Sequence, residues 1–218
     1  MLDLNFAQKA GSPLNVLCLG SHSDDIEIGC GGTILHLLNA NPDLQITWVV
    51  FSSNEEREAE ARNSAELFLK GAKKKNIMVH RFKDGFFPFD ASIKNAFEEL
   101  KSVAPDIIFT HNRHDAHQDH RVVADLTWNT FRNHFVLAYE IPKYDGDLGQ
   151  PNCFVPLSSE LYNKKVSLLM EAFQTQRSKR WFEPETFLGL MRLRGMECVA
   201  PSGYAEAFYS RKIVLSGR

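Results

Sequence analysis

The fold class of this 218-residue chain is decided by the stretch Asn15-Val-Leu-Cys-Leu-Gly-Ser-His-Ser-Asp-Asp-Ile-Glu-Ile-Gly-Cys-Gly-Gly-Thr33. Residues 15–19 are mostly apolar and predict a buried strand, which Gly20 and a polar turn bring to an end. Residues 27–38 predict a helix whose start is acidic, as the helix dipole favours. A buried strand, a polar turn and a helix in this order are typical of an α/β sheet.

The same alternation continues along the chain. Further strands are predicted at 45–52, 77–82, 106–110 and 135–141, and helices at 55–70, 91–103, 119–131, 161–173 and 183–194. Segment 144–151 is rich in turn residues, and segment 205–215 fits either a helix or a closing strand. This order predicts a Rossmann-like, mostly parallel sheet with helices on both faces. Because there is neither an internal repeat nor a clear linker, we expect residues 1–218 to form one domain.

The composition excludes several classes of protein. Lys and Arg number 25 and Asp and Glu 27, a net charge of −2 that gives no overall attraction to nucleic acid or to an anionic membrane. The longest apolar run, 46–51, is far shorter than the ~20 residues of a membrane span. The start of the chain lacks the apolar region of a signal peptide, so we expect a cytoplasmic protein. Four scattered cysteines argue against a disulfide framework and a Cys-type zinc finger.

The glycines that follow the first strand do not form a dinucleotide-binding motif. Such a motif opens with glycines directly after the strand, whereas Gly20 is followed by Ser-His-Ser-Asp-Asp. Two adjacent carboxylates would also repel a pyrophosphate. We therefore predict that the polar turn does not bind a dinucleotide.

A second polar cluster follows the predicted strand 106–110. It is Thr110-His-Asn-Arg-His-Asp-Ala-His-Gln-Asp-His-Arg121, which holds four of the eight histidines. Ligands of parallel sheets bind at the carboxyl ends of strands, so two neighbouring strands would bring both clusters to one crevice. Imidazoles and carboxylates without a thiolate suit Zn²⁺ or a related divalent metal. Either cluster alone could be a polar turn with a helix-capping Asp, but the two together favour a metal site.

The two clusters resemble the signatures of the PIG-L/LmbE-like deacetylases. Residues 22–27, His-Ser-Asp-Asp-Ile-Glu, are similar to that family's His-Pro-Asp-Asp-x-Glu, and residues 114–121 contain its His-x-Asp-His. Residues 57–60 and 204–208 match more loosely, so the resemblance runs from about residue 14 to residue 210. Ser23 stands where the family usually has proline, which implies altered rigidity of this turn and the loss of no ligand.

The resemblance implies a zinc-dependent N-acetyl-sugar deacetylase. It implies that His22, Asp25 and His120 bind Zn²⁺ and that Asp24 is the general base toward the metal-activated water. His117 would lie beside the scissile amide, where it would stabilise the oxyanion or protonate the leaving amine. Zinc suits this reaction because it lowers the pKa of water from 15.7 to about 7. Another divalent metal would serve the same purpose.

The resemblance also implies the substrate class, a small-molecule N-acetylated sugar conjugate such as a nucleotide-sugar. Arg57 lies where the family often has a substrate-contacting arginine, although a solvated helix charge explains it equally well. Arg180 belongs to segment 176–181, in which three cations lie beside a tryptophan; they could hold a phosphate or could simply be solvated. We expect segments 84–91, 144–155 and 174–182 to set specificity. The sequence leaves open whether the chain forms a homo-oligomer.

Two rival functions stay open at this point. The first is a metallohydrolase of another amide or of a phosphoester, for which His111, His114 and Asp115 could bind a second metal. The second is a non-catalytic, metal-dependent sugar-binding protein, although neither Asp24 nor His117 is needed merely to hold zinc. Asp115 or Asp119 could orient one of the imidazoles, and the sequence does not decide between them.

Overall fold

The computed structural model describes residues 12–214, and these share one seven-stranded sheet in the order β3-β2-β1-β4-β5-β7-β6. The strands are β1 (Asn15–Gly20), β2 (Gln45–Val50), β3 (Lys74–Val79), β4 (Ile107–His111), β5 (Phe135–Tyr139), β6 (Cys153–Pro156) and β7 (Ala205–Ser210). Strands β1 to β5 are parallel, and β7 runs antiparallel between β5 and β6. The expected Rossmann-like, mostly parallel sheet is confirmed. That residues 1–218 form a single domain stays a prediction.

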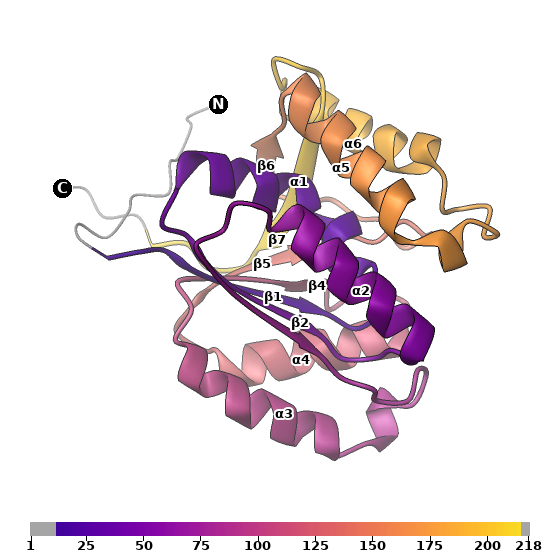
Figure 1. The fold of residues 1–218 in the computed structure, drawn as a ribbon. Coiled ribbons are helices and arrows are strands. Elements are labelled where there is room, and N and C mark those ends of the chain that lie inside the picture. The colour runs from indigo at the N-terminus through magenta and orange to yellow at the C-terminus, as the bar shows by residue number, and fades with distance from the viewer. Residues whose placement is uncertain (1–11, 215–218) are drawn as a thin grey trace.

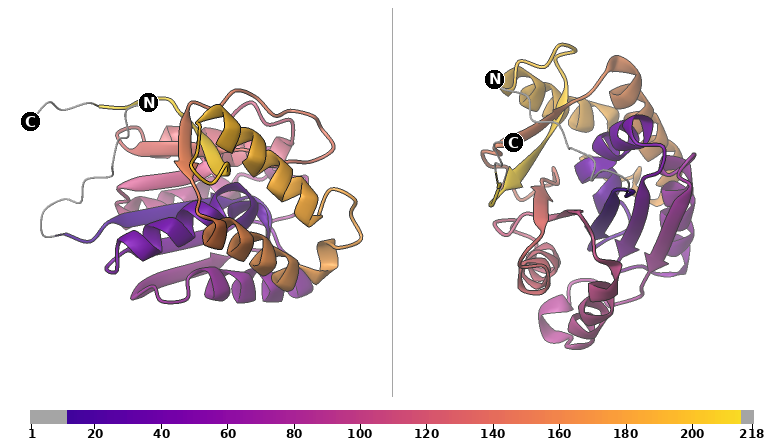
Figure 2. Two further views of the ribbon diagram at one scale, coloured as in Figure 1. Left: turned by 90° about the horizontal axis from the view of Figure 1, so that it is seen from above. Right: turned by 90° about the vertical axis from the view of Figure 1, so that its left-hand side faces the viewer.

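Helices cover both faces of the sheet, as expected (Figures 1 and 2). One face carries α1 (Asp25–Ala40), α2 (Glu55–Phe68), α5 (Ser159–Ala172) and α6 (Pro184–Glu197), and the other carries α3 (Ser92–Leu100) and α4 (Gln118–Thr130). Short 3₁₀ turns are η1 (Phe87–Phe89), η2 (Lys101–Val103) and η3 (Gln174–Gln176). Each layer has its own core, the first built around Trp48 and Phe68 and the second around Phe51 and Phe97. Within residues 12–214, no helix combines the length and apolarity that crossing a membrane requires.

The two edges of the sheet differ from the sequence prediction. Strand β3 begins at Lys74, three residues before the predicted start, because this edge strand opens with exposed polar side chains that carry no apolar pattern. Strand β6 was not predicted; it is short, only partly buried and ends at Pro156, which an edge strand tolerates. Segment 205–215 supplies β7, so the closing strand was the correct alternative.

Helix α1 lies unusually close to the sheet because it contains glycine. A Cβ atom at Gly29 would lie 2.3 Å from the ring of Tyr139 on β5. The Tyr139 hydroxyl in turn donates to the carbonyl oxygen of Leu19 at a distance of 2.6 Å. The glycines after the first strand therefore allow the helix to pack closely on the sheet. This role agrees with the prediction that they do not form a phosphate-binding loop.

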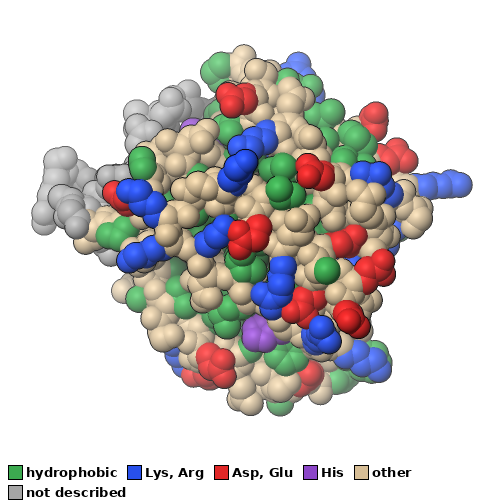
Figure 3. All heavy atoms as spheres, in the orientation of Figure 1, with side chains coloured by type: hydrophobic (Ala, Val, Ile, Leu, Met, Phe, Trp, Pro, Cys, Tyr) green, Lys and Arg blue, Asp and Glu red, His purple; other side chains and the backbone are tan. Residues whose placement is uncertain are grey.

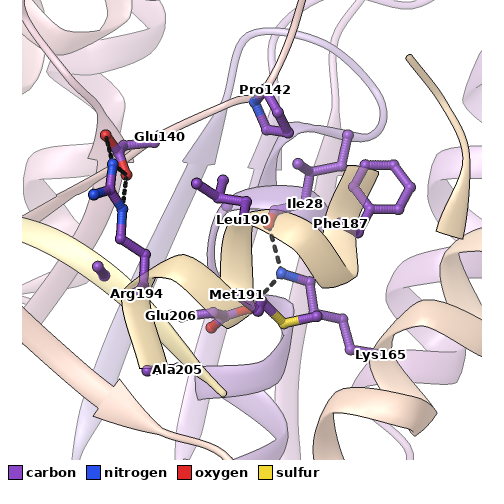
Figure 4. Close-up of a pocket in the computed structure, with 12 residues that line it drawn as sticks. Ile28, Glu140, Pro142, Lys165, Phe187, Leu190, Met191, Arg194, Ala205 and Glu206 are labelled. Carbon is purple, nitrogen blue, oxygen red and sulfur yellow. Dashed lines mark hydrogen bonds and ion pairs between the residues drawn. The ribbon is translucent and has the colours of Figure 1, made fainter. Parts of the chain in front are cut away.

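Two buried ion pairs, Lys165–Glu206 and Arg194–Glu140, tie the C-terminal elements to the rest of the fold (Figure 4). The Glu206 carboxylate on β7 accepts hydrogen bonds from the Gly32 and Thr33 backbone amides of α1 and from Lys165 Nζ of α5. Lys165 also donates to the carbonyl oxygen of Ile28 in α1. These hydrogen bonds hold α1 against β7 and α5. Removing one partner of the buried pair would leave an uncompensated charge, so the arrangement is costly to break.

The surface charges agree with the small net charge. On the face that Figure 3 shows, basic and acidic side chains are interspersed over the helices. Apolar side chains appear there between the charged ones. Such a mixed surface carries no field of one sign on that face.

The close approach of α1 gives a stability prediction. We expect Gly29→Ala to lower the free energy of unfolding by about 1–3 kcal/mol, because the added methyl group would displace the Tyr139 ring. Gly189→Ala is the matched control, since no atom lies within 4 Å of a Cβ at this exposed position of α6. Alanine there should raise the free energy of unfolding by up to about 1 kcal/mol through helix propensity. Urea denaturation of both variants measures the difference, and an unchanged Gly29→Ala midpoint would contradict the packing argument.

Candidate metal and active site

The parallel pairing of β1 with β4 brings the two polar clusters together. Val16 lies opposite Ile107 and Cys18 opposite Phe109, so the two strands end at the same edge of the sheet. The turn after β1 leads into α1 at Asp25, and the loop after β4 leads into α4 at Gln118. The condition on which the sequence argument depended, that these strands are neighbours, is therefore met.

The three residues expected to bind a metal converge at this edge. His22 Nδ1 lies 3.2 Å from His120 Nε2, and Asp25 places Oδ2 3.5 Å from His22 Nδ1 and Oδ1 3.5 Å from His120 Nε2. In a tetrahedral zinc site with bonds of about 2.0–2.1 Å, ligand atoms lie about 3.3 Å apart. The two histidine nitrogens have this separation, whereas Asp25 approaches them with different oxygens; the donor types suit a zinc-like divalent cation.

The neighbourhood holds more candidate ligands than one metal ion needs. Three overlapping sets of His and carboxylate side chains in the described chain each bring their ligand atoms within 4.8 Å of one another. They are His22 with His117 and His120, Asp25 with His111 and His120, and His22 with Asp84 and Asp119. The chain therefore offers a His/Asp cluster able to bind a metal, and the identity of the metal stays a prediction.

The alternative of a helix-capping carboxylate does not apply to Asp24. Asp24 occupies the N-cap position of α1, yet its side chain makes no capping hydrogen bond. Its Oδ1 instead accepts a hydrogen bond from Arg57 Nη2 at 3.0 Å. The first turn of α4 is capped by a histidine, because His117 Nδ1 accepts from the Asp119 backbone amide at 3.2 Å. Neither cluster is thus an ordinary carboxylate cap.

Asp115, rather than Asp119, orients the ring of His120. Asp115 Oδ2 lies 2.9 Å from His120 Nδ1, which directs the other ring nitrogen toward His22. Lys143 Nζ lies 3.0 Å from the other Asp115 oxygen. Asp119 is fully buried and accepts hydrogen bonds from the backbone amides of Gly85 and Phe87, so it holds the loop after β3 against α4.

His111 lies behind the cluster and His114 lies outside it. His111 is fully buried, and its Nε2 accepts a hydrogen bond from the Ser21 backbone amide at 3.0 Å. The same nitrogen is 3.2 Å from Asp25 Oδ2, and the His111 and His120 rings stack with their centres 3.9 Å apart. His114 is exposed, so it does not belong to the group of converging donors.

The electrostatics of the cluster favour a positive charge at the point of convergence. Burial by itself lowers the pKa of His22, but hydrogen bonds with carboxylates, that of Asp119 foremost, raise it well above its usual value. Burial by itself raises the pKa of Asp25, but the imidazoles of His120 and His111 lower it well below its usual value. The Asp25 carboxylate therefore stays ionised and attracts a cation.

Two neighbouring groups are neutral at pH 7. Burial raises the pKa of Glu27, in the first turn of α1, to about 8, so this side chain adds no negative charge behind Asp25. Burial and the nearby charges of His120 and His22 lower the pKa of His117. Because the Nδ1 atom of His117 accepts a hydrogen bond, its proton resides on Nε2.

The cluster lies at the base of a cleft of about 690 Å³, a size that suits a small molecule. Asp24, Asp25, His22, His117 and His120 all line it. Of the two residues expected to contact substrate, only Arg57 lines the cleft. It pairs with Asp24, so it is not a solvated helix charge. Arg180 is not among the lining residues, whereas Lys179 and Trp181 of the same segment are.

Sequence reasoning missed two residues of the site. Asp84 Oδ1 lies 3.0 Å from His22 Nε2, and Lys143 supports Asp115 from the loop after β5. Both follow the carboxyl ends of parallel strands, β3 for Asp84 and β5 for Lys143. That position was the available signal, because ligand sites of parallel sheets collect residues from these ends.

The fold and this His/Asp cluster define a class of α/β proteins with a candidate metal site at the carboxyl edge of the sheet. Residues 17–131 match the family model described as PIG-L, GlcNAc-PI de-N-acetylase. The match covers more than half of the chain and includes both polar clusters. The chain therefore belongs to the PIG-L family, and the expected family membership is confirmed.

Solved structures with the same fold include proteins of different activity. The conserved protein TT1542 from Thermus thermophilus is 20% identical, with a TM-score of 0.75 over 94% of this chain and 97% of that one. The N,N'-diacetylchitobiose deacetylase from Pyrococcus horikoshii is 21% identical, with a TM-score of 0.69 over 90% of this chain and 83% of that one. The 4-carboxy-2-hydroxymuconate hydratase GalB from Pseudomonas putida is 17% identical, with a TM-score of 0.73 over 94% of this chain and 99% of that one.

The contact between Asp115 and His120 gives a prediction about metal affinity. We expect Asp115→Ala to weaken Zn²⁺ binding by about 10- to 100-fold, because the imidazole loses the carboxylate that fixes its ring. Asp125→Ala is the control, since Asp125 pairs with Arg113 at the surface. Competition with a chromophoric chelator measures both affinities. Equal zinc affinity of Asp115→Ala and the wild type would show that His120 is not a ligand held in this way.

Proposed function

We propose that this protein is a zinc-dependent deacetylase that hydrolyses the N-acetyl amide of an amino-sugar-containing small molecule. The observation that carries the proposal is that His22 Nδ1, His120 Nε2 and the Asp25 carboxylate lie within 3.5 Å of one another. These are the residues that the family signature assigns to the metal. In the proposal they hold Zn²⁺, with another divalent metal as a substitute.

His22, Asp25 and His120 would hold the cation, which would serve as a Lewis acid that lowers the pKa of water toward 7 and polarises the amide carbonyl. The ligand set suits this task because three protein ligands leave a position open on a tetrahedral ion.

Asp24 is the proposed general base. Its side chain is buried at the wall of the cleft, next in sequence to Asp25 but pointing to Arg57. Arg57 in turn donates to Thr175 Oγ1 at 3.2 Å and lies 5.8 Å from the centre of the Phe173 ring. A carboxylate fixed in this way can accept the proton of an attacking water without first changing its rotamer.

His117 is the proposed partner of the carbonyl oxygen. Its lowered pKa keeps the ring neutral at pH 7, and its proton resides on Nε2, since Nδ1 accepts the Asp119 amide hydrogen. A neutral N–H donor in a partly buried cleft suits the stabilisation of a developing oxyanion. It suits protonation of the leaving amine less well, because a neutral imidazole must first gain a proton.

The substrate class rests on the family and on the cleft. The family model is described as a GlcNAc-PI de-N-acetylase, and one protein with this fold is an N,N'-diacetylchitobiose deacetylase. A cleft of about 690 Å³ accommodates a sugar conjugate of small-molecule size. Arg57 remains the proposed substrate contact beside Asp24, whereas Arg180 has no support from the cleft lining. A cytoplasmic location and a homo-oligomeric state remain expectations.

A second candidate function comes from the fold itself. One protein with this fold is a hydratase, so the fold does not fix the reaction. Hydration, hydrolysis of another amide or phosphoester, and non-catalytic sugar binding therefore compete with deacetylation. The family match and the positions of Asp24 and His117 favour deacetylation among these.

The main test combines metal content with amine release. We expect protein purified without added metal to contain about one zinc per chain, as measured by plasma mass spectrometry. We further expect it to release free amine from N-acetylhexosamine conjugates in a fluorescamine assay, and a chelator to abolish this release. Zinc without amine release from any conjugate would refute deacetylation of these sugars. Close to two metals per chain with phosphate release would support the phosphoester alternative.

The general base can be tested separately from the metal. We expect Asp24→Asn to lower kcat by about 10²- to 10⁴-fold while zinc content stays at the wild-type level. Asp43→Asn is the control, because Asp43 forms an exposed pair with Lys73. Loss of zinc from Asp24→Asn would instead assign Asp24 to the metal.

A further inference from the structure

The guanidinium group of Arg57 holds the Asp24 side chain at the wall of the cleft. Arg57 Nη2 lies 3.0 Å from Asp24 Oδ1, and both side chains are largely buried. An arginine side chain has many rotamers, so this contact persists only where other contacts fix the guanidinium group. The orientation of Asp24 therefore depends on what holds the rest of the Arg57 side chain.

The hydroxyl group of Thr175, in η3, binds the other terminal nitrogen of Arg57. It accepts hydrogen bonds from Arg57 Nη1 at 3.2 Å and from Gln176 Nε2 at 3.0 Å, and it donates to Glu60 Oε2 at 2.6 Å. One donated and two accepted hydrogen bonds are the full capacity of a hydroxyl group. Glu60 also accepts the Thr175 backbone amide hydrogen at 2.9 Å. Thr175 is therefore fixed to α2 through both its backbone and its side chain.

Glu60 is a second carboxylate within reach of the same guanidinium group. It lies three residues after Arg57 in α2, and its Oε2 is 3.7 Å from Arg57 Nη1, which is too long for a hydrogen bond. The Thr175 hydroxyl donates to this oxygen, so a neutral group satisfies Glu60. Without the hydroxyl, a largely buried carboxylate oxygen would lose its donor, and Arg57 is close enough to replace it. Thr175 thereby leaves the guanidinium group to Asp24.

The segment that follows α5 also supports the guanidinium group with an aromatic ring. Helix α5 lies beside α2 (Figure 1). The Arg57 guanidinium carbon is 5.8 Å from the centre of the Phe173 ring, which attracts a cation to its face. Phe173 is fully buried and packs edge-to-face on Phe182, so this support is rigid. Two residues from one C-terminal segment, Phe173 and Thr175, thus hold the arginine that binds Asp24.

We propose that Thr175 is a positioning residue that fixes the general base Asp24 through Arg57. Glu60 fixes Thr175 in turn. This inference rests on the proposed function, since it requires Asp24 to be the base. Among the described residues, Thr175 is not one of those that line the cleft, whereas its neighbour Gln176 is. Thr175 therefore acts through Arg57 and not by touching the substrate.

The variant Thr175→Val tests this role, because it replaces the hydroxyl group with a methyl group of similar size. We expect kcat to fall about 10- to 100-fold, the cost of a base displaced by about 1 Å, while zinc content stays at the wild-type level. Thr175→Ser keeps the hydroxyl group and should retain most of the wild-type kcat. Thr186→Val is the matched control, since Thr186 is half-buried on α6 and is not among the lining residues of the cleft.

A double-mutant cycle shows whether Thr175 acts through Asp24. We expect Thr175→Val to lower kcat no further in an Asp24→Asn background, because the base that Thr175 orients is then absent. A merely structural role would lower kcat by the same factor in both backgrounds, and this result would overturn the proposal. An effect confined to KM would overturn it as well, since Thr175 would then act on the substrate contact of Arg57.

A crystal structure of Thr175→Val tests the positioning contact without any substrate. We expect Arg57 to leave hydrogen-bonding distance of Asp24 and to approach Glu60 more closely than the present 3.7 Å. An unchanged Arg57–Asp24 contact would overturn the proposal. Movement of Arg57 in a protein whose wild type releases no amine would support the positioning contact and refute the deacetylase proposal. Amine release by the wild type, with an equal kcat for Thr175→Val, would do the opposite.

Discussion

The parallel pairing of β1 with β4 is the constraint on which the rest of the site depends. It places the turn after β1 and the loop after β4 at one edge of the sheet, although the two are about ninety residues apart, as the Ser21–His111 hydrogen bond records. Without this pairing, His22 and His120 would not approach to 3.2 Å, and neither cluster alone supplies a complete ligand set. The pairing itself follows from two continuous apolar strands that are buried on both faces.

The second requirement is that α1 hold Asp25 at a fixed height above the sheet. Gly29 allows the helix to lie against Tyr139, and Glu206 on strand β7 accepts a hydrogen bond from the Gly32 backbone amide. The C-terminal half also contacts the site through a chain of hydrogen bonds. Thr175 donates to Glu60 and accepts from Arg57, and Arg57 donates to Asp24. These contacts give a physical role to the two looser matches to the family, residues 57–60 and 204–208, which lie outside the two polar clusters in the sequence.

The sequence predicted those features that depend on local pattern. The alternation of strands and helices predicted the sheet, and the rule that ligands bind at strand ends predicted that the two polar clusters would meet. The family resemblance then singled out His22, Asp25 and His120 within them. The sequence did not predict contacts that depend on how loops pack: which of Asp115 and Asp119 orients an imidazole, that Arg57 pairs with Asp24, or that Asp84 contacts His22. Edge strands were poorly predicted for a related reason, since exposed side chains follow no apolar pattern. Arg180 was chosen over Lys179 because adjacent cations in a loop look alike until the loop is folded.

The central claim is that one zinc ion is held by His22, Asp25 and His120. A crystal structure of the zinc-loaded protein, with anomalous diffraction collected at the zinc absorption edge, tests it most directly. The account predicts one anomalous peak about 2.0–2.2 Å from His22 Nδ1, His120 Nε2 and a carboxylate oxygen of Asp25. A peak centred instead on another of the candidate groups of the described chain, such as His22 Nε2 with Asp84 and Asp119, would contradict it.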